Sequence, residues 1–118
     1  MSLERRFHPR FDIDLPITIS FDNDDIVLAG NALNISLSGL QVEVGKNVTD
    51  SILKHCPHPP EFYISIKTEQ LILEKIKLRM IINRRISQQK FQLGLKFISP
   101  SNEHLNTLNA FIQSCKTR

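Results

Sequence analysis

The stretch "FDIDLPITISF", residues 11–21, alternates strictly between apolar and other side chains. Six apolar residues occupy its odd positions, and Asp, Thr, Ser and one proline occupy the even positions. A period of two is typical of a half-buried β-strand, because successive side chains point to opposite faces. Pro16 has no N–H to donate to a neighbouring strand, so we expect an edge strand or a bulge at this position.

Shorter alternating runs follow along the chain. Apolar residues hold the odd positions in residues 33–37 and the even positions in residues 40–44. Because a one-residue slip sends side chains to the opposite face, this change predicts a turn or bulge at residues 37–39, where Gly39 supplies backbone freedom. Further runs, separated by turn residues, span residues 62–66, 72–82 and 91–97. We therefore predict an all-β fold with about six mostly antiparallel strands, forming a small barrel over residues 11–98.

Two segments do not fit the strand pattern. Residues 45–61 are irregular and rich in proline, and we expect a loop with at most one helical turn. Near the end of the chain, Leu105, Leu108, Ile112 and Cys115 recur at helical spacing, which predicts a helix over residues 99–116. We expect Ser99 to cap this helix, with Pro100 in its first position, and its apolar stripe to close an end or a seam of the barrel.

Composition limits the class of protein. The 118 residues, 41% hydrophobic and 23% charged, suit one globular domain over residues 1–118. The net charge of +3 is too mild for a general nucleic-acid coat, so any basic function needs local clustering. Two cysteines do not make a disulfide framework, and no apolar run is long enough for a transmembrane segment or a signal peptide. We expect a soluble, cytoplasmic protein.

Two short polar stretches decide the functional interpretation. The stretch "RRFHPR", residues 5–10, places three arginines before the first strand. By itself it reads as a solvated basic arm. The stretch "NISLSG", residues 34–39, by itself reads as a strand that ends in a turn, with Ser36 and Ser38 bonding to the local backbone. Their occurrence together, in this order, is more informative than either alone.

The combined pattern resembles the PilZ domain family. Arg-x-x-x-Arg stands at residues 6–10, Asn-x-Ser-x-x-Gly at residues 34–39, and "LGLKF" at residues 93–97 lies in the last strand before the helix. The resemblance runs from about residue 4 to about residue 113. It implies a six-stranded β-barrel with a C-terminal α-helix packed on it, and binding of the bacterial second messenger cyclic di-GMP. The binding set that the resemblance implies, with Arg5 added on chemical grounds, is Arg5, Arg6, Arg10, Asn34, Ser36 and Gly39.

The residue types suit that ligand. An arginine fork matches both the O6/N7 edge of guanine and phosphate oxygens, and its plane can stack on a base. Asn34 and Ser36 alternate on one strand, so we expect both on the outer barrel surface, and Gly39 lets the backbone approach the ligand. Asn34 stands where the family also has Asp. Its single carbonyl oxygen comes with a donor that opposes the donors of guanine, which is expected to lower affinity.

The resemblance also implies how the domain acts. We expect the flexible arginine-rich arm, residues 1–10, to fold over bound cyclic di-GMP and to create a surface that a downstream protein reads. In the family an arginine at the position of Arg5 favours two stacked ligands per site. The alternatives are a PilZ-like interaction scaffold that binds no ligand and a small barrel that binds single-stranded nucleic acid. The arginines oppose the first, and the lack of Trp, with a single Tyr, opposes the second.

Other candidate sites are weaker. His55, Cys56 and His58 have a spacing that matches no common zinc pattern, so we expect an ordinary loop and no metal cofactor. Arg84 and Arg85 follow a strand and are interpreted either as added positive charge near the ligand or as a solvated strand end. No grouping of nucleophile, base and orienting residue indicates catalysis, so we expect a protein that is not an enzyme, and no DNA or RNA partner.

Overall fold

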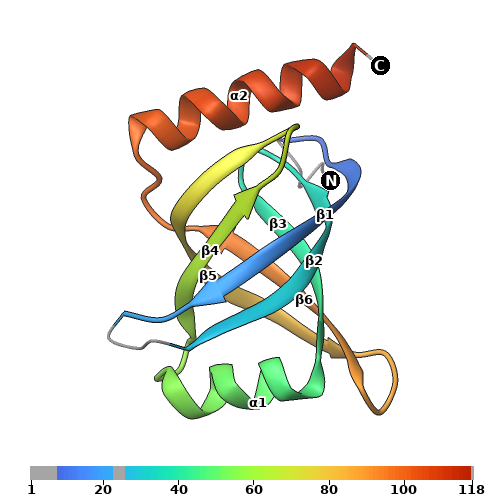
Figure 1. Cartoon of the computed structure of the whole chain (residues 1–118), viewed down its shortest axis with the longest axis vertical. Helices are drawn as coiled ribbons and strands as arrows, with labels where there is room; N and C mark the ends of the chain where they lie inside the picture. Colours follow the sequence, from blue (N-terminus) through green and yellow to red (C-terminus); the bar gives the residue numbers. More distant parts are fainter. Residues whose placement is uncertain (1–7, 23–25, 118) are drawn as a thin grey trace, which may run out of the picture.

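The chain forms a closed six-stranded β-barrel with one helix at each end (Figure 1). The structure, a computed structural model, describes residues 8–22 and 26–117. The strands follow the order β1-β2-β3-β6-β5-β4 around the barrel, and every neighbouring pair is antiparallel. The predicted all-β barrel with a C-terminal helix is therefore confirmed. The elements are β1 (Phe11–Ser20), β2 (Val27–Ile35), β3 (Gly39–Gly45), α1 (Lys46–His55), β4 (Glu61–Lys67), β5 (Ile72–Arg85), β6 (Lys90–Phe97) and α2 (Asn102–Lys116).

The first strand behaves as its alternation predicts. Leu15, Ile17 and Ile19 are buried in the barrel interior, and the residues between them are exposed. A register shift against β2 precedes Pro16, and β4 pairs with β1 only at residues 18–20. The missing N–H of Pro16 thus falls next to a bulge and beyond the β4 pairing, as expected for a proline in a strand.

The second strand changes phase earlier than the sequence indicates. A bulge against β3 lies between Ala32 and Asn34, so Ala32 and Ile35 are fully buried while Leu33 is only half-buried. The extra residue of a bulge shifts all later side chains to the other face. The predicted turn is confirmed, because β2 ends at Ile35 and β3 begins at Gly39.

Both helices correct the boundaries expected from sequence. Residues 46–55 form the ten-residue helix α1, not a loop with at most one turn. The side chains of Val48 and Ile52, on one side of this helix, are buried. Helix α2 begins at Asn102, and its N-cap is Ser101, not Ser99. Ser99 instead has a φ of 46°, in the left-handed region, which stops the chain from becoming helical there.

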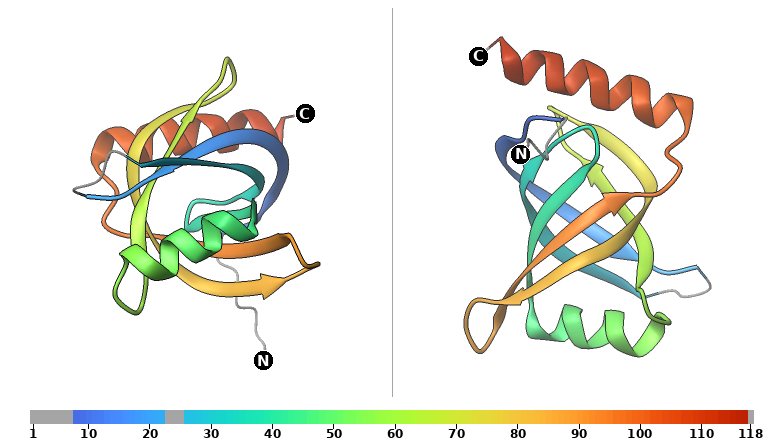
Figure 2. Two further views of the ribbon diagram at one scale, coloured as in Figure 1. Left: turned by 60° about the horizontal axis from the view of Figure 1, so that its bottom comes forward. Right: turned by 180° about the vertical axis from the view of Figure 1, so that it is seen from behind.

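The helices cover the two ends of the barrel. Figure 2 shows α1 and α2 at opposite ends, so the prediction that α2 closes an end is confirmed. Leu108, Phe111 and Ile112 of α2 belong to the same core as the strand side chains. None of the described helices is long and apolar enough to cross a membrane. The outer wall of the barrel is left as the surface on which polar side chains can gather.

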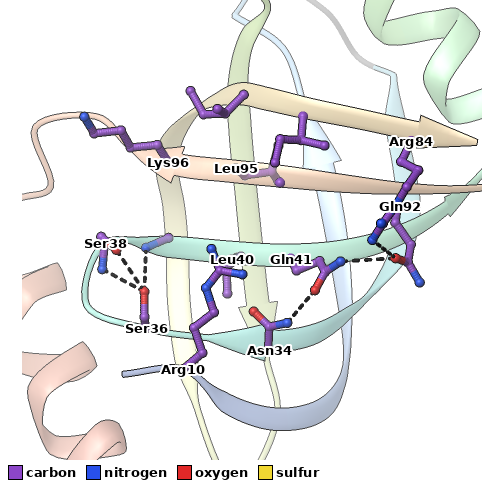
Figure 3. A pocket seen from close by; sticks show the side chains of 14 residues that line it. Arg10, Asn34, Ser36, Ser38, Leu40, Gln41, Arg84, Gln92, Leu95 and Lys96 are labelled. Atoms are coloured by element: carbon purple, nitrogen blue, oxygen red, sulfur yellow. Dashed lines mark hydrogen bonds between the residues drawn. The ribbon is translucent and has the colours of Figure 1, made fainter. Parts of the chain in front are cut away.

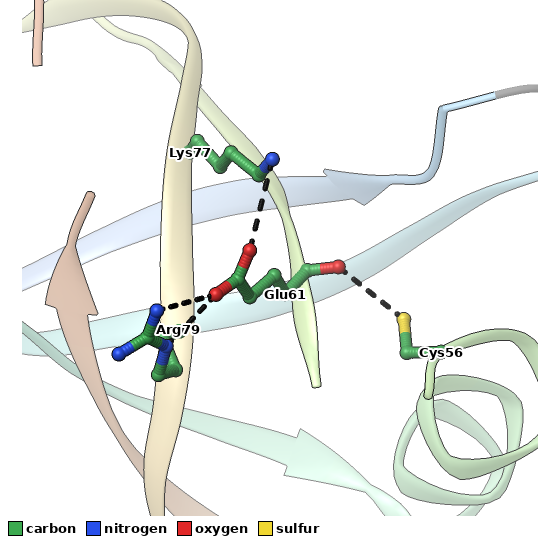
Figure 4. Close-up of polar contacts among 4 residues, drawn as sticks. All are labelled: Cys56, Glu61, Lys77 and Arg79. Atoms are coloured by element: carbon green, nitrogen blue, oxygen red, sulfur yellow. Dashed lines mark hydrogen bonds and ion pairs between the residues drawn. The ribbon is translucent and has the colours of Figure 1, made fainter. Parts of the chain in front are cut away.

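One face of β4 and β5 carries a small ion cluster (Figure 4). Glu61 accepts a hydrogen bond from Arg79 at 2.8 Å, and Lys77 lies 3.7 Å from the same carboxylate. The hydrogen bond from Arg79 is the main reason that the pKa of Glu61 is lowered from its ordinary value. The cluster ties two neighbouring strands together across their surface.

Candidate ligand-binding site

A cavity of about 420 Å³ lies on the outer face of β2, β3, β6 and β5 (Figure 3). The cavity extends from Arg10, the residue before β1, past the β2–β3 turn to residues 81–84 of β5. Four of the residues predicted for the site therefore surround one cavity: Arg10, Asn34, Ser36 and Gly39. The remaining described residues that line it are Ser38, Leu40, Gln41, Ile81, Ile82, Arg84, Gln92, Gly94, Leu95 and Lys96.

The charges of this cavity have one sign. Arg10, Arg84 and Lys96 line it, and no carboxylate belongs to its described lining. No Asp or Glu among residues 8–22 and 26–117 forms an ion pair with any of these three cations, although five other ion pairs occur in that part of the chain. Uncompensated cations around a concave surface attract anions. The site therefore favours a negatively charged ligand.

Ser36 is part of the turn itself. Its side chain is buried, and its hydroxyl oxygen accepts hydrogen bonds from the backbone N–H groups of Ser38 at 3.1 Å and Gly39 at 3.3 Å. A third contact joins the hydroxyls of Ser36 and Ser38 at 3.0 Å, and the Ser36 N–H donates to the Gly39 carbonyl. The expected bonding of Ser36 to the local backbone is therefore present. The expectation that Ser36 stands on the outer barrel surface in phase with Asn34 is wrong, because β2 ends at Ile35 and the Ser36 side chain is buried in the turn. Ser36 thus forms part of the cavity lining and holds the turn beside it in shape.

Gly39 is required for a different reason than expected. No glycine in the described chain has a positive φ, so the turn does not use the backbone freedom that we expected of this residue. A Cβ at Gly39 would instead lie 2.0 Å from the Leu95 carbonyl oxygen of β6. The absence of a side chain thus lets β3 and β6 approach each other closely at the edge of the cavity.

A chain of side-chain amides crosses the cavity floor. The Asn34 amide nitrogen donates to Gln41 Oε1 at 2.5 Å, and Gln41 Nε2 donates to Gln92 Oε1 at 3.1 Å. Arg84 Nη2 donates to the same Gln92 oxygen at 3.2 Å. Figure 3 shows these four side chains in a row, with the Asn34 oxygen turned away from Gln41. We call this row of Asn34, Gln41, Gln92 and Arg84 the amide relay.

The far wall of the cavity is apolar. The register of β5 against β6 shifts between Met80 and Ile82, and the bulge leaves both Ile81 and Ile82 more than half exposed. The sequence places Ile82 in the apolar phase of its strand, so its outward position was not predicted. Two exposed isoleucines beside the cations give a surface on which a base or sugar can lie while its phosphate meets the charges.

The remaining candidates are not among the residues that line the cavity in the described part of the chain. Arg5 and Arg6 fall outside the described residues. The His55 ring stacks on Phe21, with ring centroids 5.3 Å apart. Cys56 Sγ donates to the Glu61 carbonyl (Figure 4), and burial raises the pKa of this thiol. In residues 8–22 and 26–117, no group of three or more His, Cys, Asp or Glu side chains is placed to hold a metal ion.

Comparison with known proteins assigns the chain to a family. The PilZ domain profile matches residues 4–114, nearly the whole chain. The chain belongs to the PilZ domain family. No match was found among curated protein sequences. The motif residues that first indicated this family, at residues 6–10 and 34–39, both lie within the matched range.

Solved structures of PilZ proteins share the fold. The PilZ domain of YcgR from Escherichia coli, solved with c-di-GMP, superposes with a TM-score of 0.71 at 16% identity, covering 97% of this chain and 93% of that one. The K. pneumonia MrkH–c-di-GMP complex gives 0.75 at 14% identity, covering 98% and 54%. The Bacillus subtilis inhibitor of motility MotI/DgrA gives 0.69 at 16% identity, covering 98% and 51%. The chain thus spans about half the length of the last two proteins.

Proposed function

We propose that this PilZ domain is a receptor for cyclic di-GMP and that the ligand lies in the cavity over β2, β3, β6 and β5. The observation that carries the proposal is the described lining, in which three cations lie without a carboxylate, beside an amide acceptor and an apolar wall. Cyclic di-GMP has two phosphodiester charges and two guanines. Arginine forks suit its phosphates and the O6/N7 edges of its guanines. The PilZ structures solved with c-di-GMP support the choice of ligand.

The proposed action begins at the N-terminal side of the cavity. Arg10 stands immediately before β1 and lines the cavity, and the other two arginines of the arm precede it. We expect the ligand charges to draw residues 1–10 onto the barrel, because the like charges of the arm repel one another until an anion compensates them. The ordered arm and the ligand together form a new surface for a downstream protein. In this role the domain binds and signals, without catalysing a reaction.

We propose two stacked cyclic di-GMP molecules per site. A stacked pair carries four phosphate charges, so it needs more cationic groups than one molecule does. The described lining supplies Arg10, Arg84 and Lys96. Arg5 and Arg6 precede Arg10 by a few positions in the sequence and add two further cations. Binding is then expected to weaken steeply with salt, because more charge is neutralised.

The two alternatives make different demands on the same surface. A barrel that binds single-stranded nucleic acid stacks successive bases on exposed aromatic side chains. The described lining of the cavity contains no aromatic residue, which favours a small anionic ligand. A scaffold that binds no ligand has no need of three cations around one cavity that form no ion pair with the Asp and Glu residues of the described chain.

Calorimetric titration with cyclic di-GMP tests the proposal. We expect saturable binding by the wild type, and we expect Arg10→Ala to weaken it by about tenfold to a hundredfold, through loss of one bidentate contact. Arg85→Ala is the matched control, because Arg85 bonds to the Ser87 carbonyl and is not among the residues that line the cavity. Circular dichroism checks that both variants fold.

The outcomes separate the parts of the proposal. No binding by the wild type, or equal affinities for the wild type and Arg10→Ala, contradicts the receptor function at this cavity. Native mass spectrometry of the saturated complex counts the ligands. One ligand per chain refutes the stacked pair, whereas a change from two ligands to one in Arg5→Leu supports the role of Arg5.

A further inference from the structure

The amide relay has a direction that only one of its members can set. Arg84 carries N–H donors and no acceptor, whereas each amide can present either its oxygen or its nitrogen to a neighbour. Gln92 must therefore turn its oxygen toward Arg84, at 3.2 Å. Because that same oxygen also faces Gln41, Gln41 must donate a hydrogen bond to it from its amide nitrogen, at 3.1 Å.

The constraint passes on to Asn34. With its nitrogen committed to Gln92, Gln41 offers its oxygen to Asn34, so Asn34 must donate its amide nitrogen, as observed at 2.5 Å. The Asn34 carbonyl oxygen then remains on the side turned away from Gln41 (Figure 3). The Asn34 nitrogen, which would oppose the donors of a guanine, is thus turned toward Gln41 with one N–H bonded there, and the carbonyl oxygen is the Asn34 group on the opposite side.

The strands hold the relay in register. Asn34 on β2 pairs with Gln41 on β3, and Gln92 on β6 pairs with Arg84 on β5. Strands β3 and β6 are themselves neighbours along residues 39–45. Side chains of paired positions on one sheet face lie within hydrogen-bonding reach of each other. The direction set at β5 is therefore transmitted across four strands to the motif residue on β2.

We infer that Arg84 is a positioning residue that sets the base preference of the site, by fixing Asn34 as a hydrogen-bond acceptor. This inference rests on the proposed binding of cyclic di-GMP. The Watson–Crick edge of guanine presents two donors, N1–H and N2–H, which an acceptor satisfies. At these same two positions adenine has the acceptor N1 and a C–H group, so it offers the Asn34 oxygen no N–H donor there, and N1 meets that oxygen with like partial charges. The site therefore selects cyclic di-GMP over cyclic di-AMP, which has the same phosphates.

The test measures a ratio of dissociation constants. Titration with cyclic di-GMP and with cyclic di-AMP gives the preference of the wild type. Replacing Arg84 with Met frees the relay to reverse, so we expect this preference to fall by about tenfold or more, as for the loss of one directional base contact. Because both ligands carry the same charge, a purely electrostatic role of Arg84 weakens both equally and leaves the ratio unchanged.

Two further variants complete the design. Arg84→Lys keeps a donor-only side chain, and we expect it to preserve the guanine preference. Lys96→Met removes another cation of the same cavity that has no place in the relay, so it should weaken both ligands without changing their ratio. An unchanged ratio in Arg84→Met, with cyclic di-GMP still bound by the wild type, overturns the inference alone. A wild type that binds neither ligand overturns the proposed function as well.

Discussion

At the scale of single residues, the motif at residues 34–39 divides into two kinds of position. Ser36 and Gly39 build the turn, because the Ser36 hydroxyl binds the backbone of the turn and Gly39 allows the contact with β6. Asn34 and Arg10 present polar groups to the cavity. A change at the first kind is expected to act on folding, and a change at the second kind on binding.

Gly39→Ala tests the structural half of this division. Its Cβ would lie 2.0 Å from a backbone oxygen of Leu95, which cannot move without separating β3 from β6. We expect the free energy of unfolding to fall by about 1–3 kcal/mol, the usual cost of overpacking. Urea unfolding measures it. Gly94→Ala is the control, since its Cβ would lie 3.2 Å from the Cβ of the exposed Ile82, a contact that needs a shift of only a few tenths of an ångström, so we expect a smaller loss of stability. Equal stability of Gly39→Ala and the wild type would contradict this account.

The sequence predicts the motif part of the site but not its other half. Arg10 and Asn34 are found because their spacing matches a family pattern. Gln41 and Gln92 look like ordinary outward residues of strands, and only the pairing of β3 with β6 brings them together. Lys96 is hidden in the same way, because which cations lie near residue 10 depends on barrel closure and not on local pattern.

At the scale of elements, bulges decide which residues face the cavity. The register shift between Met80 and Ile82 turns two isoleucines toward the cavity, and the register shift between Ala32 and Asn34 sets the phase of the motif strand.

A second feature at this scale is the ion cluster across β4 and β5. Glu61 is paired with Arg79 in register, and both Arg79 and Lys77 hold its carboxylate.

The pH dependence of stability should report this cluster. The hydrogen bond from Arg79 lowers the pKa of Glu61 from its ordinary value of 4.5. Such a group stabilises the fold fully at pH values above its unfolded pKa, and the contribution is lost as the pH falls through the lower folded pKa. We expect Glu61→Gln to be slightly less stable than the wild type at about pH 6, with the difference shrinking at about pH 3. The effect should be small because the side chains of the cluster are only partly buried and water screens their charges.

Urea unfolding at the two pH values measures that difference. Glu74→Gln is a suitable control, because Glu74 lies 3.8 Å from Lys67 in a more exposed pair and should change stability less. A difference between Glu61→Gln and the wild type that is the same at both pH values would show that the charge of Glu61 does not contribute to it.

Element boundaries mark the limit of what pattern alone predicts. The strands are found because their side chains alternate over many residues. Helix α1 is missed because its N-cap, Gly45, makes no side-chain capping bond and its first turn carries no acidic residue. Three prolines follow it closely, at positions 57, 59 and 60, which favours a loop interpretation. The start of α2 is misplaced because Ser99, Pro100 and Ser101 offer two plausible caps, and only the bond from the His104 N–H to the Ser101 hydroxyl decides between them.

At the scale of the whole molecule, the barrel leaves its wall for binding. The interior is filled with apolar side chains, and α1 and α2 cover the two ends. The cavity therefore forms outside, over β2, β3, β6 and β5, with Arg10 at the point where the arm enters β1. A ligand there contacts Arg10 and the barrel at once. In the proposed mechanism, binding is thereby linked to a change in the surface that a partner meets.

Amide hydrogen exchange with and without cyclic di-GMP tests this central claim most directly. We predict slower exchange in the bound protein at residues 5–10, 36–39 and 92–96, because these backbone segments surround the proposed ligand. Strand β4 and helix α1, which supply no residue to the described lining, should be unchanged. Slowing confined to β4 or α1, or no change at residues 5–10 at saturating ligand, would contradict the proposal that the arm closes over a ligand in this cavity.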